Sequence, residues 1–132
     1  MVRRKTSKPT DGELEILRVL WETGPATVRQ VNEALNKARP TGYTTTLKLM
    51  QIMTEKGFLD RNEADRTHIY RPAVSQESTQ SRMVGELLDK VFEGSAEALV
   101  MKALSARKVS AEELARIREL IDKFEGGKSD EH

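Results

Sequence analysis

The stretch from Gly42 to Gly57, GYTTTLKLMQIMTEKG, constrains the fold more than any other part of the chain. Its two glycines bound a segment long enough for about four helical turns. In a helix, one side of this segment has the i, i+3, i+4, i+7 spacing of residues that pack against a core. That side carries Thr46, Leu49, Met50 and Met53. The sequence therefore predicts a helix from Tyr43 to Lys56 with one buried face.

The opposite face of this predicted helix is polar, and hydrogen-bonding groups are concentrated near its start. Hydroxyl, amine and amide side chains are the groups that contact phosphates and base edges in DNA. The residues that we predict to read bases are Tyr43, Thr44, Thr45, Lys48 and Gln51. A polar face that is merely solvated is the alternative interpretation, because most amphipathic helices have one.

Two shorter helices are predicted before this one, and each begins at a capping box. Thr10 and Glu13 satisfy the first free amides of a helix that runs to about Thr23. The second helix, Val28 to Asn36, begins at Thr27 and is short, as a supporting helix would be.

Two extended segments, residues 57–61 and 67–72, follow the third helix and are separated by a polar, turn-prone stretch. Three helices followed by a hairpin is the order of a winged helix-turn-helix, in which the second helix braces the third in the major groove. The hairpin tip then lies along the DNA backbone. The predicted phosphate contacts are Arg29, Arg61 and Arg66.

The chain beyond residue 75 predicts three amphipathic helices, over residues 76–94, 95–105 and 110–126. Their apolar faces have no obvious core within the chain left to cover, so they suit the interface of an intertwined dimer. The residues predicted to form that interface are Val84, Leu87, Leu88, Val91, Leu99, Leu104, Leu114, Ile117, Ile121 and Phe124. A small helical bundle that folds on itself is the alternative, although about 56 residues is a short chain for one.

The predicted fold class is mainly α with a small β-hairpin. We expect a basic flexible arm over residues 1–9, a winged helix-turn-helix DNA-binding domain over 10–73, a helical dimerisation region over 74–126, and a disordered tail over 127–132. The distribution of charge fits separate polyanion-binding and association regions. Residues 1–72 carry 13 Lys or Arg and 9 Asp or Glu, whereas residues 73–132 carry 9 and 12. Differences of this size also arise by chance.

Composition argues against several classes of function. The chain has no Cys and two His, so neither a metal site nor a cofactor is expected. An enzyme is not expected either, because the sequence contains no nucleophile paired with a His base and no Gly-rich phosphate loop. No run approaches the roughly 18 apolar residues of a membrane span, so we expect a cytoplasmic protein without membrane insertion.

Several motifs occur in a characteristic order: TDGELEIL at 10–17, LW at 20–21, YTTT at 43–46, EKGFL at 55–59 and YRP at 70–72. Together they resemble the penicillinase-repressor family, which includes the BlaI and MecI repressors of β-lactam resistance and the copper-responsive CopY repressors. The resemblance covers roughly residues 7–125. The resemblance implies an N-terminal winged helix and a C-terminal dimerisation region. It also implies a homodimer that binds a palindromic operator in double-stranded DNA and blocks transcription until a signal removes it.

Two departures from the family pattern limit what the resemblance implies. Copper sensing through a Cys-rich motif is excluded, because the chain has no Cys. The β-lactam members are cut by a regulatory protease at an Asn-Phe bond, and here Lys102-Ala103 stands in that place. The resemblance thus places a cleavage region at Met101, Lys102 and Ala103 without the family's cleavage residues. A winged-helix adaptor that binds a protein instead of DNA is the alternative function.

Overall fold

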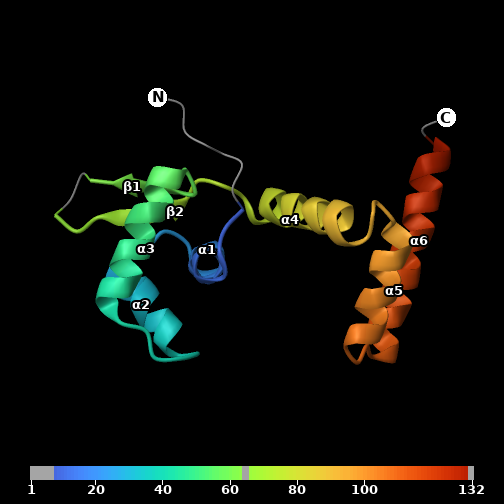
Figure 1. The fold of residues 1–132 in the computed structure, drawn as a ribbon, viewed down its shortest axis with the longest axis horizontal. Coiled ribbons are helices and arrows are strands. Elements are labelled where there is room, and N and C mark those ends of the chain that lie inside the picture. The colour runs from blue at the N-terminus through green and yellow to red at the C-terminus, as the bar shows by residue number, and fades with distance from the viewer. Residues whose placement is uncertain (1–7, 64–65, 131–132) are drawn as a thin grey trace. The chain divides into compact units, whose positions relative to one another are not determined.

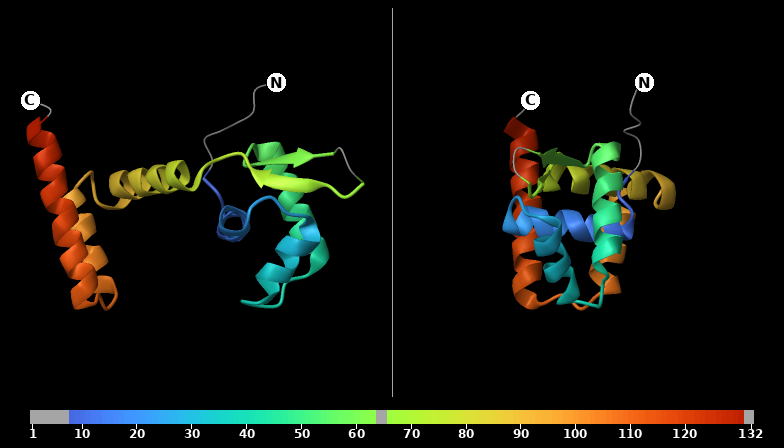
Figure 2. Two further views of the ribbon diagram at one scale, coloured as in Figure 1. Left: turned by 180° about the vertical axis from the view of Figure 1, so that it is seen from behind. Right: turned by 90° about the vertical axis from the view of Figure 1, so that its left-hand side faces the viewer.

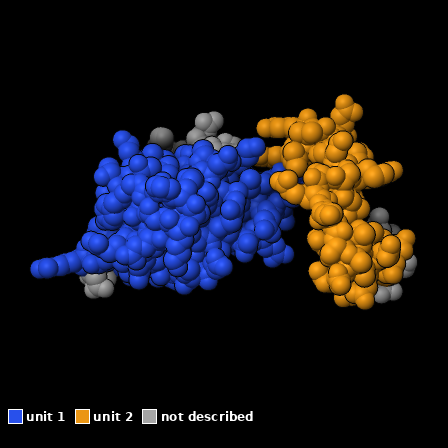
Figure 3. Space-filling model, turned by 90° about the horizontal axis from the view of Figure 1, so that it is seen from below, with its two compact units in different colours: residues 1–85 blue, residues 86–132 orange. Residues whose placement is uncertain are grey.

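The computed structural model describes residues 8–63 and 66–130 (Figure 1). The predicted arm, residues 1–9, therefore lies mostly outside the described residues. The chain divides into two compact units, residues 1–85 and residues 86–132 (Figure 3).

The first unit begins with three helices, α1 (Asp11–Thr23), α2 (Val28–Asn36) and α3 (Tyr43–Lys56). Both predicted capping boxes are present, at the starts of α1 and α2. Thr10 Oγ1 accepts a hydrogen bond from the Glu13 amide at 3.2 Å, and Glu13 Oε1 accepts one from the Thr10 amide at 3.0 Å. The sequence prediction of these three helices is confirmed.

A two-stranded antiparallel hairpin, β1 (Leu59–Asn62) and β2 (Ile69–Pro72), follows α3. Leu59 pairs with Pro72 and Asn62 with Ile69, so the strands are shorter than the predicted segments. Figure 2 shows the hairpin beside the C-terminal end of α3. Three helices and a hairpin in this order confirm the predicted winged-helix class.

The core of the first unit lies between α1, α2, α3 and the hairpin. Its buried apolar residues are Ile16, Leu17, Leu20, Ala26, Val28, Val31, Met50, Met53, Phe58, Leu59 and Tyr70. The chain turns sharply after α1 and after α3, where Gly24 and Gly57 have φ values of 91° and 92°. Glycine adopts such values without the steric cost that a side chain would bring.

The fourth helix, α4 (Gln76–Val91), begins in the first unit. Trp21 Nε1 donates a hydrogen bond of 3.0 Å to the Val74 carbonyl, and Thr79 in the first turns of α4 is buried. Our sequence boundary at Ala73 therefore differs from the compact unit, which extends to Gly85. The bond from Trp21 ties Val74 to α1, and the burial of Thr79 shows that the packed part of the chain continues into α4, which explains the difference.

The second unit contains the end of α4 together with α5 (Ala96–Ala106) and α6 (Ala111–Asp130). Figures 1 and 2 show α5 and α6 side by side and running in opposite directions. The prediction that the last helix ends at Gly126-Gly127 is wrong, since α6 continues to Asp130. Neither glycine adopts the positive φ that ends a helix. Glycine within a helix costs about 1 kcal/mol relative to alanine, which weakens the helix without breaking it.

Candidate nucleic-acid interface

Helix α3 has the two faces that its sequence predicts. Thr46, Met50 and Met53 are buried and face the core. The five predicted base-reading residues, Tyr43, Thr44, Thr45, Lys48 and Gln51, are all exposed. Leu47 lies between these exposed residues in the sequence, but it is half-buried and packs against the core. The exposed face of α3 therefore offers three hydroxyls, an ammonium and an amide to a partner.

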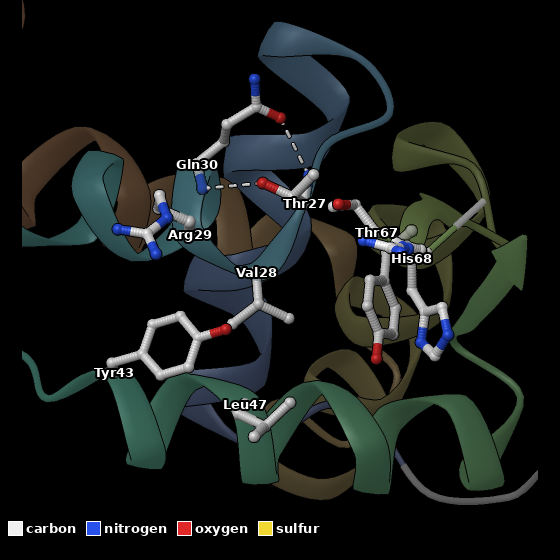
Figure 4. Close-up of a pocket in the computed structure, with 10 residues that line it drawn as sticks. Thr27, Val28, Arg29, Gln30, Tyr43, Leu47, Thr67 and His68 are labelled. Carbon is white, nitrogen blue, oxygen red and sulfur yellow. Dashed lines mark hydrogen bonds between the residues drawn. The ribbon is translucent and has the colours of Figure 1, made fainter. Parts of the chain in front are cut away.

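A groove of about 560 Å³ opens between α2, α3 and β2 (Figure 4). It brings together three of the predicted contacts from three different places in the chain: Arg29 near the start of α2, Tyr43 at the start of α3, and Arg66 in the loop before β2. Two cations and a phenol around one groove can hold an anionic backbone. The other predicted contacts, Thr44, Thr45, Lys48, Gln51 and Arg61, do not line this groove.

The groove also contains polar residues that the sequence analysis did not select. Thr27, Gln30, Thr67 and His68 lie on its walls (Figure 4). Thr27 and Gln30 are already engaged with each other, through bonds of 3.1 Å from the Gln30 amide to Thr27 Oγ1 and 2.9 Å from the Thr27 amide to Gln30 Oε1. The sequence identifies their capping box, but it gives no sign that the box lies beside the hairpin.

A short backbone bridge holds the start of α2 against the hairpin. Ala26 and Tyr70 exchange hydrogen bonds, at 3.0 Å from the Ala26 amide to the Tyr70 carbonyl and 2.8 Å in the other direction. Both residues are buried. Because Ala26 directly precedes the N-cap residue Thr27, the bridge determines how far α2 lies from β2, and therefore the width of the groove.

Arg61, a predicted phosphate contact, is engaged within the chain. Its guanidinium forms an ion pair with Glu63, and its Nε donates to Glu63 Oε2 at 2.9 Å. Hydrogen bonds to Glu63 and then to Tyr70 raise the pKa of Arg61 above its ordinary value. Arginine is always charged in proteins, so a phosphate would compete with Glu63 for this side chain. Its role as a phosphate contact stays a prediction.

The apolar faces of the C-terminal helices are largely uncovered. Between Glu86 and Gly127, no side chain is buried. Five of the predicted dimerisation residues, Leu88, Leu99, Leu104, Leu114 and Ile117, are half-buried, and the other five, Val84, Leu87, Val91, Ile121 and Phe124, are exposed. Val100, Met101 and Leu120 are also exposed, although they are not among the residues predicted to form the dimer interface. The residues of the implied cleavage region, Met101, Lys102 and Ala103, lie inside α5.

Within residues 8–63 and 66–130, no three His, Asp or Glu side chains gather in a way that could hold a metal ion. No helix in the same ranges is both long and apolar enough to cross a membrane.

Comparison with known proteins decides the family. The family model described as penicillinase repressor matches residues 9–123. This chain belongs to the penicillinase repressor family. The sequence resemblance to that family is thereby confirmed.

Relatives in the family align over nearly the whole chain. A protein named transcriptional regulator BlaI, from Mycobacterium tuberculosis, is 31% identical over 125 residues, which cover 93% of this chain and 89% of that protein. The penicillinase repressor of Bacillus licheniformis is 20% identical over 96% of this chain and 99% of its own length. The methicillin resistance regulatory protein MecI of Mammaliicoccus sciuri is 22% identical over 90% and 97%.

A solved structure agrees with the fold of the first unit. The solution structure of the DNA-binding domain of the repressor BlaI matches 57% of this chain and 90% of that chain, with a TM-score of 0.50 and 21% identity. This likeness supports the winged-helix fold within the family.

Proposed function

We propose that this protein is a DNA-binding transcriptional repressor that acts as a homodimer on a palindromic operator. The observation that carries the proposal is the exposed polar face of α3 beside the groove that holds Arg29 and Arg66. Hydroxyl, amide and ammonium groups on a helix fit the donor and acceptor pattern of the major groove. The arginines supply the contacts to phosphates that fix position without reading sequence.

The residues proposed to contact base edges are Tyr43, Thr44, Thr45, Lys48 and Gln51. Thr44 and Thr45 can bond bases or phosphates, and their methyl groups can contact a thymine methyl. Lys48 can bond a guanine or a phosphate. Arg29, Arg61 and Arg66 hold the backbone on either side.

A shift assay on palindromic DNA from upstream of the protein's own gene tests the reading role. The double variant Thr44→Ala, Lys48→Ala should lose its preference for the operator over scrambled DNA while remaining dimeric. Lys37→Ala is the control, since Lys37 is an exposed lysine at the end of α2, away from the groove that Arg29 lines. If the double variant binds the operator as tightly as the wild type, α3 is not the reading helix.

Salt dependence separates this function from that of a protein-binding adaptor. Binding to phosphates releases counterions, so operator affinity should fall steeply as salt rises. An adaptor of the same fold would show no affinity for DNA even at low salt.

The dimer is proposed from the apolar surface of the C-terminal helices. Among the described residues, the large apolar side chains that are more than 40% exposed all lie between Val84 and Phe124, apart from Tyr43. Phe124 is 77% exposed, an unusual state for a phenyl ring that has no partner. A second copy of the chain would cover these side chains. Two DNA-binding units joined in this way require half-sites about one helical turn apart, or a multiple of that distance.

Sedimentation equilibrium tests the dimer. Phe124→Glu should give a monomer, whereas Lys123→Glu, an exposed neighbour on the same helix, should leave the dimer intact. A wild-type chain that sediments as a monomer at micromolar concentration would overturn the proposal.

Release is proposed to follow from an event in residues 76–125 that weakens dimerisation. A single DNA-binding unit makes too few phosphate contacts to hold a site at physiological salt. Proteolysis between Met101 and Ala103 is one such event. Because these residues lie within α5, the helix must unfold locally before a protease can bind this segment in an extended conformation. A fragment ending in this region, in cells where the target gene is expressed, would support cleavage. An intact chain in those cells would contradict it.

A further inference from the structure

Helix α3 begins differently from the two helices before it. The first turns of α1 and α2 are closed by the side chains of Thr10 and Thr27. The N-cap residue of α3 is Gly42, which has no side chain to make such a bond. Side chains other than that of the N-cap residue therefore fix the place where α3 starts.

Asn36, in the last turn of α2, holds the backbone of Thr41 from both sides. Its Oδ1 accepts a hydrogen bond from the Thr41 amide at 2.9 Å, and its Nδ2 donates to the Thr41 carbonyl at 2.9 Å. The same Nδ2 donates to the Asn32 carbonyl at 2.8 Å. One side chain thus joins α2 to the residue that precedes the N-cap of α3.

Asn32, one turn earlier on α2, joins Thr41 to the first turn of α3. Its Nδ2 donates to the Thr41 carbonyl at 3.0 Å and to Thr46 Oγ1 at 2.9 Å, so both of its amide protons are used. Thr46 is fully buried, and its hydroxyl donates in turn to the Gly42 carbonyl at 3.2 Å. The buried hydroxyl therefore has both a donor and an acceptor.

We propose that Asn32, Asn36 and Thr46 are positioning residues that set the rotation and starting point of α3 for base reading. The inference rests on the proposed function of α3. Thr46 points inward while Thr44 and Thr45 are exposed, so the buried bonds of Thr46 determine where those two hydroxyls lie. A slip of one residue would turn the helix by about 100° and move the reading groups off the DNA. These three residues need not touch DNA to control which sequence is read.

A purely stabilising network would behave differently under conservative substitution. Thr46→Val keeps the shape of the side chain and removes the hydroxyl, whereas Thr46→Ser keeps the hydroxyl and removes a buried methyl group. If the bonds matter for position, the valine variant should lose sequence preference and the serine variant should keep it. If the network only adds stability, operator preference should follow stability in both variants.

The test uses the full chain and measures two quantities. The first is the ratio of affinities for operator and scrambled DNA, by fluorescence anisotropy. We expect Asn32→Ala and Thr46→Val to lower this ratio about tenfold or more, the effect of losing one base contact, with scrambled affinity unchanged. Thr46→Ser should stay within about threefold of wild type. An affinity ratio that is unchanged in Thr46→Val overturns the inference. If Asn32→Ala fails to fold, Thr46→Val by itself still tests whether the network positions α3.

The second quantity is hydrogen exchange of the amides of Thr41 and Thr46, which does not depend on DNA. Exchange at Thr41 should rise in Asn36→Ala, and exchange at Thr46 should rise in Asn32→Ala and Thr46→Val. Unchanged exchange in all three contradicts the positioning role. A wild-type protein without operator preference, but with the expected changes in exchange, would instead overturn the proposed function and leave the positioning of α3 supported.

Discussion

The ammonium nitrogen of Lys56, in the last turn of α3, lies 2.8 Å from Oε2 of Glu13, in the first turn of α1. The Glu13 side chain is 2% exposed, and its other oxygen accepts the bond from the Thr10 amide. One carboxylate therefore caps α1 and anchors the far end of α3. The asparagine side chains of α2 hold the near end, so α3 is fixed to the core at both ends.

Loss of Lys56 should destabilise the first unit. Lys56→Met removes the partner of a buried carboxylate, and we expect the free energy of unfolding to fall by about 1–3 kcal/mol. The value lies at the low end for buried pairs because Lys56 is 35% exposed and water can partly replace it. Chemical denaturation of the full chain, followed by circular dichroism, measures the change.

A second ion pair to α1 provides the matched control. Arg39 pairs with Glu15, but both side chains are more exposed, at 56% and 33%. Arg39→Met should therefore cost less than about 1 kcal/mol. If both variants lose the same free energy of unfolding, the burial of Glu13 does not determine how strongly its ion pair with Lys56 stabilises the protein.

Gly24→Ala tests the turn between α1 and α2. The residue has φ 91° and ψ −178°, a region that essentially only glycine adopts, and an added Cβ would meet no atom within 4 Å. Backbone strain alone should lower the free energy of unfolding by about 1–3 kcal/mol. Gly126→Ala, at an open position within α6, should instead strengthen its helix by about 0.5–1 kcal/mol. Thermal denaturation of both variants checks the opposite signs.

Glu63→Gln should increase DNA affinity. Glu63 holds the Arg61 guanidinium, and removing its charge frees Arg61 for a phosphate. The slope of log affinity against log salt should steepen by about one, as for one additional phosphate contact. Glu22→Gln removes the same charge from an exposed position on α1 and controls for net charge. A slope that changes equally in both variants would contradict a specific role for Glu63.

Shortening the chain separates the two units. A chain that ends at Gly85 keeps the bond from Trp21 to the Val74 carbonyl and the buried Thr79, whereas a chain that ends at Ala73 loses both. The shorter chain should be less stable by about 1–3 kcal/mol. Under the proposed function, the chain ending at Gly85 should be a folded monomer that binds the operator at least about tenfold more weakly than the full chain. Undiminished affinity would argue against a role for the dimer.

Local signals in the sequence predict most of the first unit. Thr10 and Thr27 mark the starts of α1 and α2 because their capping boxes need only residues three positions apart. The spacing of Thr46, Met50 and Met53 predicts the buried face of α3 for the same reason, since a helix repeats over a few residues. Such features depend on neighbours in the chain, so a single sequence contains them.

Features that join distant residues were not predictable in this way. The bond from Trp21 to Val74, the pair of Glu13 and Lys56, and the bridge of Ala26 and Tyr70 each depend on tertiary packing. The same holds for the groove, which exists because α2 meets β2. The predicted end of α6 at Gly126-Gly127 failed because neither glycine adopts the left-handed backbone conformation with which a glycine commonly ends a helix.

Under the proposed function, the bridge between Ala26 and Tyr70 has a thermodynamic consequence for DNA binding. Its two backbone bonds join the start of α2 to β2 before any DNA is present. The bridge fixes the spacing of Arg29 and β2, and the conformational entropy that this costs is therefore lost during folding. Binding to a DNA backbone then costs less conformational entropy in this part of the surface, so more of the contact energy contributes to affinity.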